Sequence, residues 1–316
     1  MRHLICLTID TDPDGLTAQS INRQSLRWDA LDGIASLLEE LHVLAAPEGS
    51  VPITWFLRAD GQLESVFGSA LYLVERFAAL WNEMRCEGHE FGWHPHLYRQ
   101  PGPGSPFELI TNPRQAADEI LRLWPAVKIG CLPFSAFRNG EGWHDGLTLE
   151  TIEGLGFWLD STAIPGRIGP AGHPMNWATT PSGPYFPDRV DIRVPGGRRG
   201  VLEIPISTWH LQAPFDSSPK VRYINPAFHP ELFHQGLQSV RSRFNGGGLR
   251  IWTLVVHPDE AFAGSPADQL YSRSPRAVRT NLELLASALR EESGAEVQFV
   301  TMTQAAREWL RFREAA

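Results

Sequence analysis

Short apolar runs alternate along this chain with longer amphipathic stretches, and this alternation limits its fold more than any other feature. The apolar run HLICLTID precedes ALDGIASLLEELHVL, and VPITWFLRAD precedes SALYLVERFAALWNEMRCEG. Short apolar runs are typical of buried strands, whereas a period of 3.6 residues is typical of helices that pack on them. The pattern therefore predicts an α/β fold with a mostly parallel sheet.

The length of 316 residues is compatible with one large barrel or with two average domains. We find no internal repeat, low-complexity tract or interdomain linker, so we expect a single domain over residues 1–316. The segment at about 166–200 is rich in Pro and Gly and has no periodicity. We expect it to form an irregular loop excursion at one mouth of the barrel.

Charge, cysteine content and hydropathy exclude several classes of partner and compartment. A formal net charge of -8 argues against nucleic acid, whose binding proteins usually have a basic face. Cys6, Cys86 and Cys131 are too few and too far apart for a disulfide framework. The chain runs from Met1 directly into a strand pattern and has no apolar stretch long enough to span a bilayer. We therefore expect a cytoplasmic protein without a membrane span.

Ionisable side chains collect at the carboxyl ends of the expected strands. They are Asp10, Asp12, His94, His96, Arg138, Asp160 and His257. In parallel α/β barrels this rim carries the active site, while the opposite rim mainly serves stability. The same residue types also cap helices or fill cores, so each one alone predicts little.

Two pairs of these residues have the spacing of a metal site. Asp10 and Asp12 are two residues apart, so in an extended chain both carboxylates project to one side and require a cation or a proton. His94 and His96 repeat this spacing with imidazoles. Two imidazoles and one carboxylate form a three-ligand zinc site that leaves a position for water. Capping of the next turn is the competing interpretation for the acids.

His257 and Arg138 complete the candidate site. His257 follows the apolar run LRIWTLVV, a placement that suits a neutral imidazole able to donate a proton, although a buried structural histidine fits as well. Arg138 is a fixed cation that could pair with Asp10 and keep it ionised.

The motifs occur in an order that resembles a known family. LTIDTDPD, GHEFGWHPHLY, FRNGEGW, WLDSTAIPG, VLEIPIS and LVVHPDE resemble the motif series of the polysaccharide deacetylase (NodB-homology, carbohydrate esterase) family over nearly the whole chain. The resemblance implies a distorted (β/α) barrel of about seven parallel strands. It also implies a metal-dependent hydrolase that acts on the C–N amide bond of an N-acylated sugar.

The resemblance assigns roles to individual residues. It implies that Asp10 is the general base, that His257 is the general acid and that Arg138 is part of the catalytic set. The family's adjacent acid pair is split here by Thr11, so the metal-binding acid maps onto Asp12. One divalent metal ion is implied, and Zn²⁺ is favoured by the ligand types.

The second histidine of the family motif departs from its usual place. It normally stands four residues after the first, but Tyr98 occupies that position here. A phenol with a pKa near 10 is a poor ligand for Zn²⁺ at neutral pH. His257 could reach the metal but would then be lost as the acid, so we expect Asp12, His94 and His96 to be the ligands.

The sequence constrains the substrate less than it constrains the metal site. Trp93, Trp143 and Trp209 fall beside the candidate strand ends, where indole rings can stack on sugar faces, although barrel packing explains them equally well. With Asp160 they form the expected substrate-binding set for an N-acyl sugar or short oligosaccharide. Two alternatives remain open: a small-molecule amidase of the allantoinase-like branch, and a non-catalytic sugar-binding protein of the same fold.

Overall fold

The computed structural model describes residues 1–15, 26–45, 50–102, 104–130, 132–197, 200–244, 248–262 and 269–315. The chain forms two compact units. The first contains Met1–Asp14, Trp28–Thr54 and Ile206–Ala316, and the second contains Gly15–Arg27 and Trp55–Pro205. The single domain expected over residues 1–316 stays a prediction.

A parallel sheet forms the centre of the fold. Its strands are β1 (Arg2–Asp10), β2 (Ile53–Arg58), β3 (Glu90–His94), β6 (Phe134–Phe137), β7 (Leu159–Asp160), β8 (Leu202–Glu203), β11 (Leu249–Val256) and β12 (Glu296–Phe299). Neighbouring strands follow the order β11-β1-β2-β3-β6-β7-β8, and β12 also pairs with β1. All residues of β2, and all of β1 except the first, are buried, as expected for strands covered on both faces. The predicted α/β class is confirmed.

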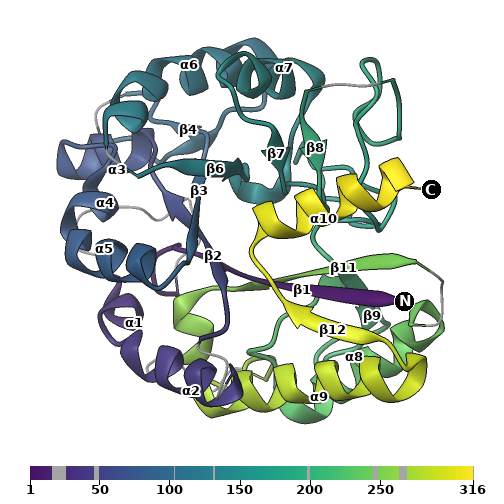
Figure 1. The fold of residues 1–316 in the computed structure, drawn as a ribbon. Coiled ribbons are helices and arrows are strands. Elements are labelled where there is room, and N and C mark those ends of the chain that lie inside the picture. Colours follow the sequence, from purple (N-terminus) through teal and green to yellow (C-terminus); the bar gives the residue numbers. More distant parts are fainter. Residues whose placement is uncertain are drawn as a thin grey trace. The chain divides into compact units, whose positions relative to one another are not determined.

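In the first unit, β1 lies between β11 and β12 (Figure 1). It pairs in parallel with β11 from Arg2↔Leu249 to Ile9↔Val256. The helices of this unit are α1 (Asp29–Asp32), α2 (Ala35–Ala45), α8 (Pro230–Val240), α9 (Pro275–Ser293) and α10 (Met302–Ala315). Two short 3₁₀ helices, η2 (Arg241–Arg243) and η3 (Pro258–Ala261), and the antiparallel hairpin of β9 (Thr208–Leu211) with β10 (Lys220–Tyr223) complete it.

The sequence of α9 shows why this helix forms. Proline at its first position and Gly294 in a left-handed conformation just past its end match the usual start and stop signals. Its buried residues, Val278, Leu282, Leu285, Ala286 and Leu289, recur at helical spacing. The stripe packs within the first unit, where α9 contacts α2 and α8 (Figure 1).

In the second unit, β3, β6, β7 and β8 pair in parallel in that order. Its helices are α3 (Gly61–Phe67), α4 (Tyr72–Arg76), α5 (Ala78–Cys86), α6 (Pro113–Ile129) and α7 (Gly146–Gly154), with the 3₁₀ turn η1 (Gly140–Gly142). β4 (Tyr98–Arg99) and β5 (Glu108–Leu109) form a small antiparallel pair. α6 and α7 lie side by side (Figure 1).

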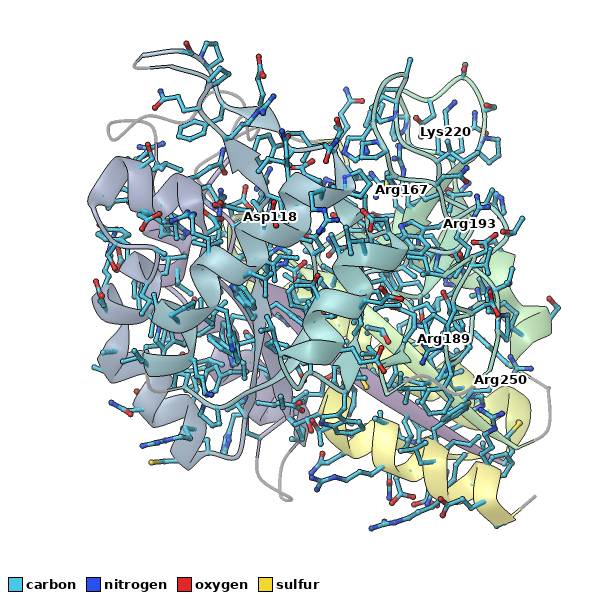
Figure 2. All side chains as sticks on the ribbon, turned by 90° about the horizontal axis from the view of Figure 1, so that it is seen from above. Asp118, Arg167, Arg189, Arg193, Lys220 and Arg250 are labelled. Carbon is cyan, nitrogen blue, oxygen red and sulfur yellow. The ribbon has the colours of Figure 1, made fainter. Side chains whose placement is uncertain are left out.

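The described residues between 166 and 200 have little regular structure, and the excursion over a barrel mouth expected for them stays a prediction. They contain no helix and no extended strand, but isolated bridges join Ile168 to Asn176 and Pro187 to Pro195. Figure 2 labels three arginines of this segment, of which Arg193 donates from Nε to Asp191 Oδ1 at 2.8 Å. Local hydrogen bonds and bridges of this kind give a segment without periodicity a defined path.

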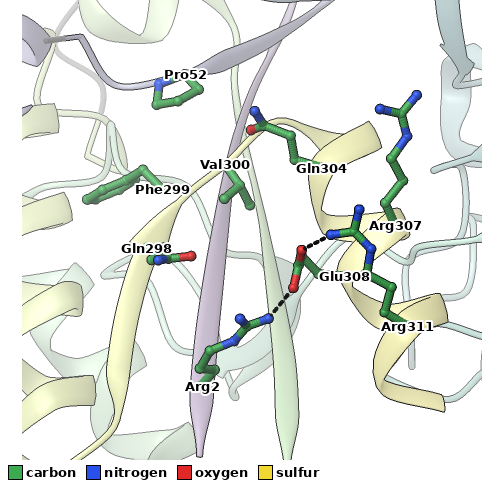
Figure 3. Close-up of a pocket in the computed structure, with 9 residues that line it drawn as sticks. All are labelled: Arg2, Pro52, Gln298, Phe299, Val300, Gln304, Arg307, Glu308 and Arg311. Atoms are coloured by element: carbon green, nitrogen blue, oxygen red, sulfur yellow. Dashed lines mark hydrogen bonds and ion pairs between the residues drawn. The ribbon is translucent and has the colours of Figure 1, made fainter. Parts of the chain in front are cut away.

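A cavity of about 530 Å³ lies at the amino end of β1 in the first unit (Figure 3). Glu308 pairs there with Arg2 and with Arg311. Arg2 begins β1 and Asp10 ends it, so roughly 25 Å of extended chain separates the cavity from the candidate acids. The cavity therefore belongs to the rim opposite to the candidate active site.

Two further expectations can be checked on the described residues. Cys6 is buried and Cys86 is exposed, and neither forms a disulfide within the described residues, while Cys131 lies outside them. No helix in the described part of the chain is long and apolar enough to cross a membrane.

Candidate active site

Parallel pairing of β1 with β11 brings two candidate residues together in the first unit. Ile9 pairs with Val256, so the residues that follow these two strands leave the sheet next to each other. Asp10 ends β1 and is buried, and Asp12 lies two residues further on. His257 comes directly after β11, and its Nε2 lies 3.7 Å from Asp12 Oδ2. The meeting of these strand ends was predicted from the sequence.

The segment after Asp12 is fixed by the start of α1. Thr11 accepts a hydrogen bond through its carbonyl oxygen from Trp28 Nε1 at 3.1 Å. Asp14 Oδ2 accepts from the backbone N–H of Ala30 at 3.2 Å, and burial raises the pKa of Asp14. Asp14 thus binds a backbone N–H in the first turn of α1, and capping stays the competing interpretation for Asp10 and Asp12.

Glu260 is a site residue that the sequence reasoning missed. His257 Nδ1 lies 3.0 Å from Glu260 Oε1, and the backbone N–H of His257 donates to Glu260 Oε2 at 2.7 Å. Asn225 Nδ2 donates to the same Oε2 at 2.6 Å. The i, i+3 spacing within HPDE, at the start of η3, is the capping-box pattern that could have revealed this contact.

The two partners shift each other's pKa. Burial opposes the charged form of His257, but Glu260, Tyr223 and Asp12 outweigh burial and hold the pKa of His257 well above its usual value. Burial would raise the pKa of Glu260, yet the charge of His257 and the hydrogen bonds from it leave that pKa below its ordinary value. In the metal-free protein both shifts favour an imidazolium beside a carboxylate.

The second unit holds the two candidate histidine ligands. His94 is the last residue of β3, and its Nδ1 lies 2.9 Å from the carbonyl oxygen of Arg138. A carbonyl only accepts hydrogen bonds, so Nδ1 carries the proton and Nε2 keeps its lone pair. His96 follows Pro95, and its backbone N–H donates to Asp60 Oδ2 at 3.3 Å. Asp60 also caps α3, and Arg58 binds it at 2.6 Å, so the acceptor is held in place.

The two imidazoles face each other with nitrogen atoms that fit a metal ion. His94 Nε2 and His96 Nε2 are 3.2 Å apart, and both side chains are buried. His96 Nδ1 lies 3.4 Å from Glu141 Oε1, a contact without hydrogen-bond geometry. With the lone pair of His94 on Nε2, the 3.2 Å contact is a hydrogen bond from His96 Nε2, and a metal ion bound to both nitrogens would replace its proton. Two nitrogens bound tetrahedrally to one Zn²⁺ at about 2.0–2.1 Å stand about 3.3 Å apart. The two nitrogens therefore fit one divalent ion between them.

Tyr98, which stands four residues after His94, is not on a helical turn. β3 ends at His94 and β4 begins at Tyr98, with no helix between them. Residues 95–97 belong to no helix or strand, and the backbone N–H of Tyr98 donates to the carbonyl oxygen of His96 at 3.0 Å, so the chain turns at Leu97. The extended backbone expected through Pro95 stays a prediction. The Tyr98 ring stacks near that of His96, at 6.4 Å between ring centroids.

Arg138 is held within the second unit. Its Nε donates to the carbonyl oxygen of Ser161 and its Nη2 to Ser161 Oγ, each at 2.9 Å. The guanidinium also lies 3.9 Å from the centroid of the Phe56 ring. The proposed partner, Asp10, belongs to the other unit, and that pairing stays a prediction.

Asp160 is surrounded by polar side chains of its own unit. Thr162 Oγ1 donates to Asp160 Oδ1 at 2.7 Å, and His144 Nε2 lies 3.6 Å from Oδ2. Glu203 on β8 is its register partner, and burial followed by the charge of Asp160 raises the pKa of Glu203 well above its ordinary value. Asp160 is only 1% exposed, so these contacts give its expected role with substrate no support.

The three candidate tryptophans are also interior residues. Trp93, Trp143 and Trp209 are 0%, 2% and 2% exposed. Trp93 packs edge-on against Phe137, and Trp209 packs edge-on against Phe233. This is the barrel packing that was the alternative interpretation of these rings. Sugar stacking by them stays a prediction, and their packing does not favour it.

Comparison with known proteins places the fold. No family model matches the sequence, and no curated protein matches it. Among solved structures, one described as a glycoside hydrolase/deacetylase from Parabacteroides distasonis matches with a TM-score of 0.61 and 13% identity, over 98% of this chain and 71% of that one. The chain has the polysaccharide deacetylase fold.

Two further structures agree with this fold. One, described as a polysaccharide deacetylase from Mycobacterium smegmatis, matches with a TM-score of 0.52 and 18% identity over 99% of this chain and 91% of that one. Puue allantoinase matches with a TM-score of 0.53 and 12% identity, over 97% of this chain and 90% of that one. The predicted distorted (β/α) barrel of the deacetylase type is confirmed. Sequence identities this low establish only the fold, so the reaction has to be inferred from the residues of the site.

Proposed function

We propose that this chain is a metal-dependent hydrolase that removes an acyl group, in the first instance acetyl, from the nitrogen of an N-acylated sugar. One observation carries the proposal: two buried imidazoles present their Nε2 atoms to each other at 3.2 Å on a deacetylase fold. Two nitrogens this close share either a proton, as in the hydrogen bond of the metal-free protein, or one divalent ion, and their separation matches that of two imidazoles on one Zn²⁺.

The proposed ligands are Asp12, His94 and His96. Two imidazoles and a carboxylate suit Zn²⁺, although other first-row divalent ions accept the same set. When bound, the ion supplies a Lewis acid and lowers the pKa of water from 15.7 toward about 7. The carbonyl of Arg138 orients His94 and so fixes which nitrogen is available as a ligand.

The other residues of the site move protons. In this proposal the Asp10 carboxylate takes a proton from the attacking water as its oxygen bonds to the acyl carbon. Nε2 of the His257 imidazolium then gives its proton to the departing nitrogen as the C–N bond breaks. Glu260 holds Nδ1 of the same ring at 3.0 Å and keeps Nε2 directed toward the Asp12 side. The products are a carboxylic acid, acetate in the simplest case, and the free amino sugar.

Acetate release tests this function. The purified protein is stripped with a chelator, reloaded with Zn²⁺ or Co²⁺, and incubated with N-acetylated monosaccharides, short oligosaccharides and their nucleotide-linked forms. We expect release to depend on added metal and to favour soluble substrates. A protein that binds these sugars without releasing acetate under any metal would contradict the proposal and favour a non-catalytic sugar-binding member of the fold.

A second candidate is an amidase acting on a small amide that is not a sugar. The likeness to Puue allantoinase, at a TM-score of 0.53, is of the same order as the likeness to the Mycobacterium smegmatis protein. Hydrolysis of ureides or cyclic imides by the same metal-loaded protein, without acetate release from acetamido sugars, would favour this candidate.

A further inference from the structure

The loop after β6 follows the histidine segment closely. The backbone N–H of Arg138 donates to the carbonyl oxygen of Trp93 at 3.0 Å, and that of Gly140 donates to Pro95 at 2.8 Å. Both segments lie in the second unit. The position of His96 is therefore tied to the path of residues 138–142.

Gly140 makes room for the imidazole of His96. A Cβ atom at position 140 would lie 2.5 Å from His96 Cδ2 and 2.8 Å from its Nε2. Carbon atoms do not approach each other so closely, so any other residue here would displace the ring or the loop. The His96 ring thus lies directly against the backbone of this loop.

Glu141 has an unusual backbone conformation at this point. Its φ is 57° and its ψ is 8°, in the left-handed region. Among the described non-glycine residues only Glu141 and Arg273 have positive φ. Such conformations disfavour a residue with a side chain, and they persist where the surroundings impose them, often at functional sites. A glycine would fit this backbone with less strain, so the presence of glutamate calls for a role of its side chain.

The Glu141 carboxylate reaches the outer nitrogen of His96. Oε1 lies 3.4 Å from His96 Nδ1, and Oε2 lies 4.0 Å from His173 Nε2. A carboxylate on the outer nitrogen of a metal-binding histidine fixes its tautomer and ring orientation and makes the inner nitrogen a stronger ligand. His94 receives the same help from the carbonyl of Arg138.

We infer that Glu141 is a positioning residue that makes His96 a metal ligand, in place of a histidine four residues after His94. This inference rests on the proposed metal site and adds the reason that a spacing of two residues works in this chain. Gly140 leaves room for the ring, and Nε2 of His96 faces that of His94 at 3.2 Å. The Glu141 carboxylate lies 3.4 Å from His96 Nδ1, close enough to accept a hydrogen bond from it when a metal ion occupies Nε2.

Glu141→Gly is the decisive variant because it removes the carboxylate while relieving the left-handed backbone. Any loss of metal affinity then cannot come from added strain. Glu141→Gln keeps the shape and removes the charge, and Glu108→Gln, at an exposed strand position of the same unit, is the matched control. Zn²⁺ affinity is measured by competition with a chelator of known affinity, and Co²⁺ absorption reports the coordination. Thermal unfolding of the metal-free proteins checks the fold.

We expect Glu141→Gly to bind Zn²⁺ about 10- to 100-fold more weakly than the unaltered protein, with an altered Co²⁺ spectrum and no loss of thermal stability. Glu141→Gln should lie between them, and Glu108→Gln should match the unaltered protein. In a His96→Ala background, Glu141→Gly should cause no further loss, because Glu141 acts through His96.

Unchanged Zn²⁺ affinity in Glu141→Gly, in a protein that binds one ion, would overturn the role of Glu141 and leave the proposed function standing. An equal additional loss in the His96→Ala background would also overturn it, since the effect would then not pass through His96. Failure of the unaltered protein to bind Zn²⁺ or Co²⁺ would overturn the proposed metal site and this inference together.

Discussion

Glu260 Oε1 lies 3.0 Å from His257 Nδ1, at the opposite side of the imidazole from the Nε2 that faces Asp12. This contact gives His257 a fixed ring orientation and a proton on Nδ1. Against the effect of burial, Glu260, Tyr223 and Asp12 raise the pKa of His257 and so favour a second proton on Nε2, the nitrogen that faces Asp12. Asn225 donates to the other oxygen of Glu260, so the orienting carboxylate is itself held. This arrangement suits the proposed general acid, and that role stays a prediction beside the alternative of a buried structural histidine.

Replacement of His257 by alanine should abolish turnover without removing the metal. A positioned acid is worth about 10²–10⁴-fold in rate, because the departing amine is otherwise too basic to leave. We expect His257→Ala to lose acetate release by that factor and to retain its metal, as measured by elemental analysis. Loss of the ion from folded His257→Ala would instead make His257 a ligand.

Substitutions of Asp10 and Asp12, the two candidate acids of LTIDTDPD, should have different effects on metal binding and on proton transfer. Asp12→Ala removes the only carboxylate in the proposed ligand set, so we expect the folded variant to lose its ion. Asp10→Asn leaves that set intact and removes the base, so metal should stay while turnover falls by about 10²–10⁴-fold. Asp32→Asn, on the exposed side of α1, is the control for a general effect of charge. Near-normal activity of Asp10→Asn would refute its role as base.

The choice between His96 and Tyr98 can be tested directly. His96 Nε2 lies 3.2 Å from His94 Nε2, whereas Tyr98 begins β4 after a turn at Leu97. His96→Ala should therefore lose metal affinity, whereas Tyr98→Phe should keep it, with both measured by chelator competition. Full metal binding by His96→Ala would reverse the assignment.

The sequence predicted the parts of the site that depend on single strands. Long apolar runs located β1 and β11, and parallel pairing then placed Asp12 beside His257. Glu260 was missed because its contact depends on the short turn of η3 and not on a strand. The burial of Trp93 was not predictable because strand position alone does not say whether an indole faces a core or a cleft.

Contacts between segments that are distant along the chain could not be predicted from the sequence either. Asp160 and Glu203 are register partners on β7 and β8, but the irregular excursion between these strands hides their proximity. A polar residue at a strand end did not reveal this buried carboxyl pair, and the substrate contact expected for Asp160 stays a prediction. The same holds for Glu141, whose contact with His96 depends on a left-handed residue that no pattern in FRNGEGW reveals.

The last prediction concerns the pH dependence of stability that this carboxyl pair causes. Burial, and after it the charge of Asp160, raises the pKa of Glu203 well above its ordinary value of 4.5. The folded protein therefore holds a proton on Glu203 that the unfolded chain releases above about pH 4.5. Because the folded state binds more protons there, this group makes the free energy of unfolding fall as pH rises, by up to about 1.4 kcal/mol per pH unit, until pH passes the raised pKa.

Glu203→Gln removes this dependence, since an amide keeps the shape, cannot ionise, and can donate a hydrogen bond to Asp160. Urea unfolding of both proteins between pH 4 and 8 gives the difference in free energy of unfolding, in which the other titrating groups largely cancel. We expect the glutamine variant to gain stability relative to the unaltered protein as pH rises from 4.5 toward 8. Two profiles that run parallel across this range would show that Glu203 is already ionised in the folded protein, and that its partner contacts stabilise the charge.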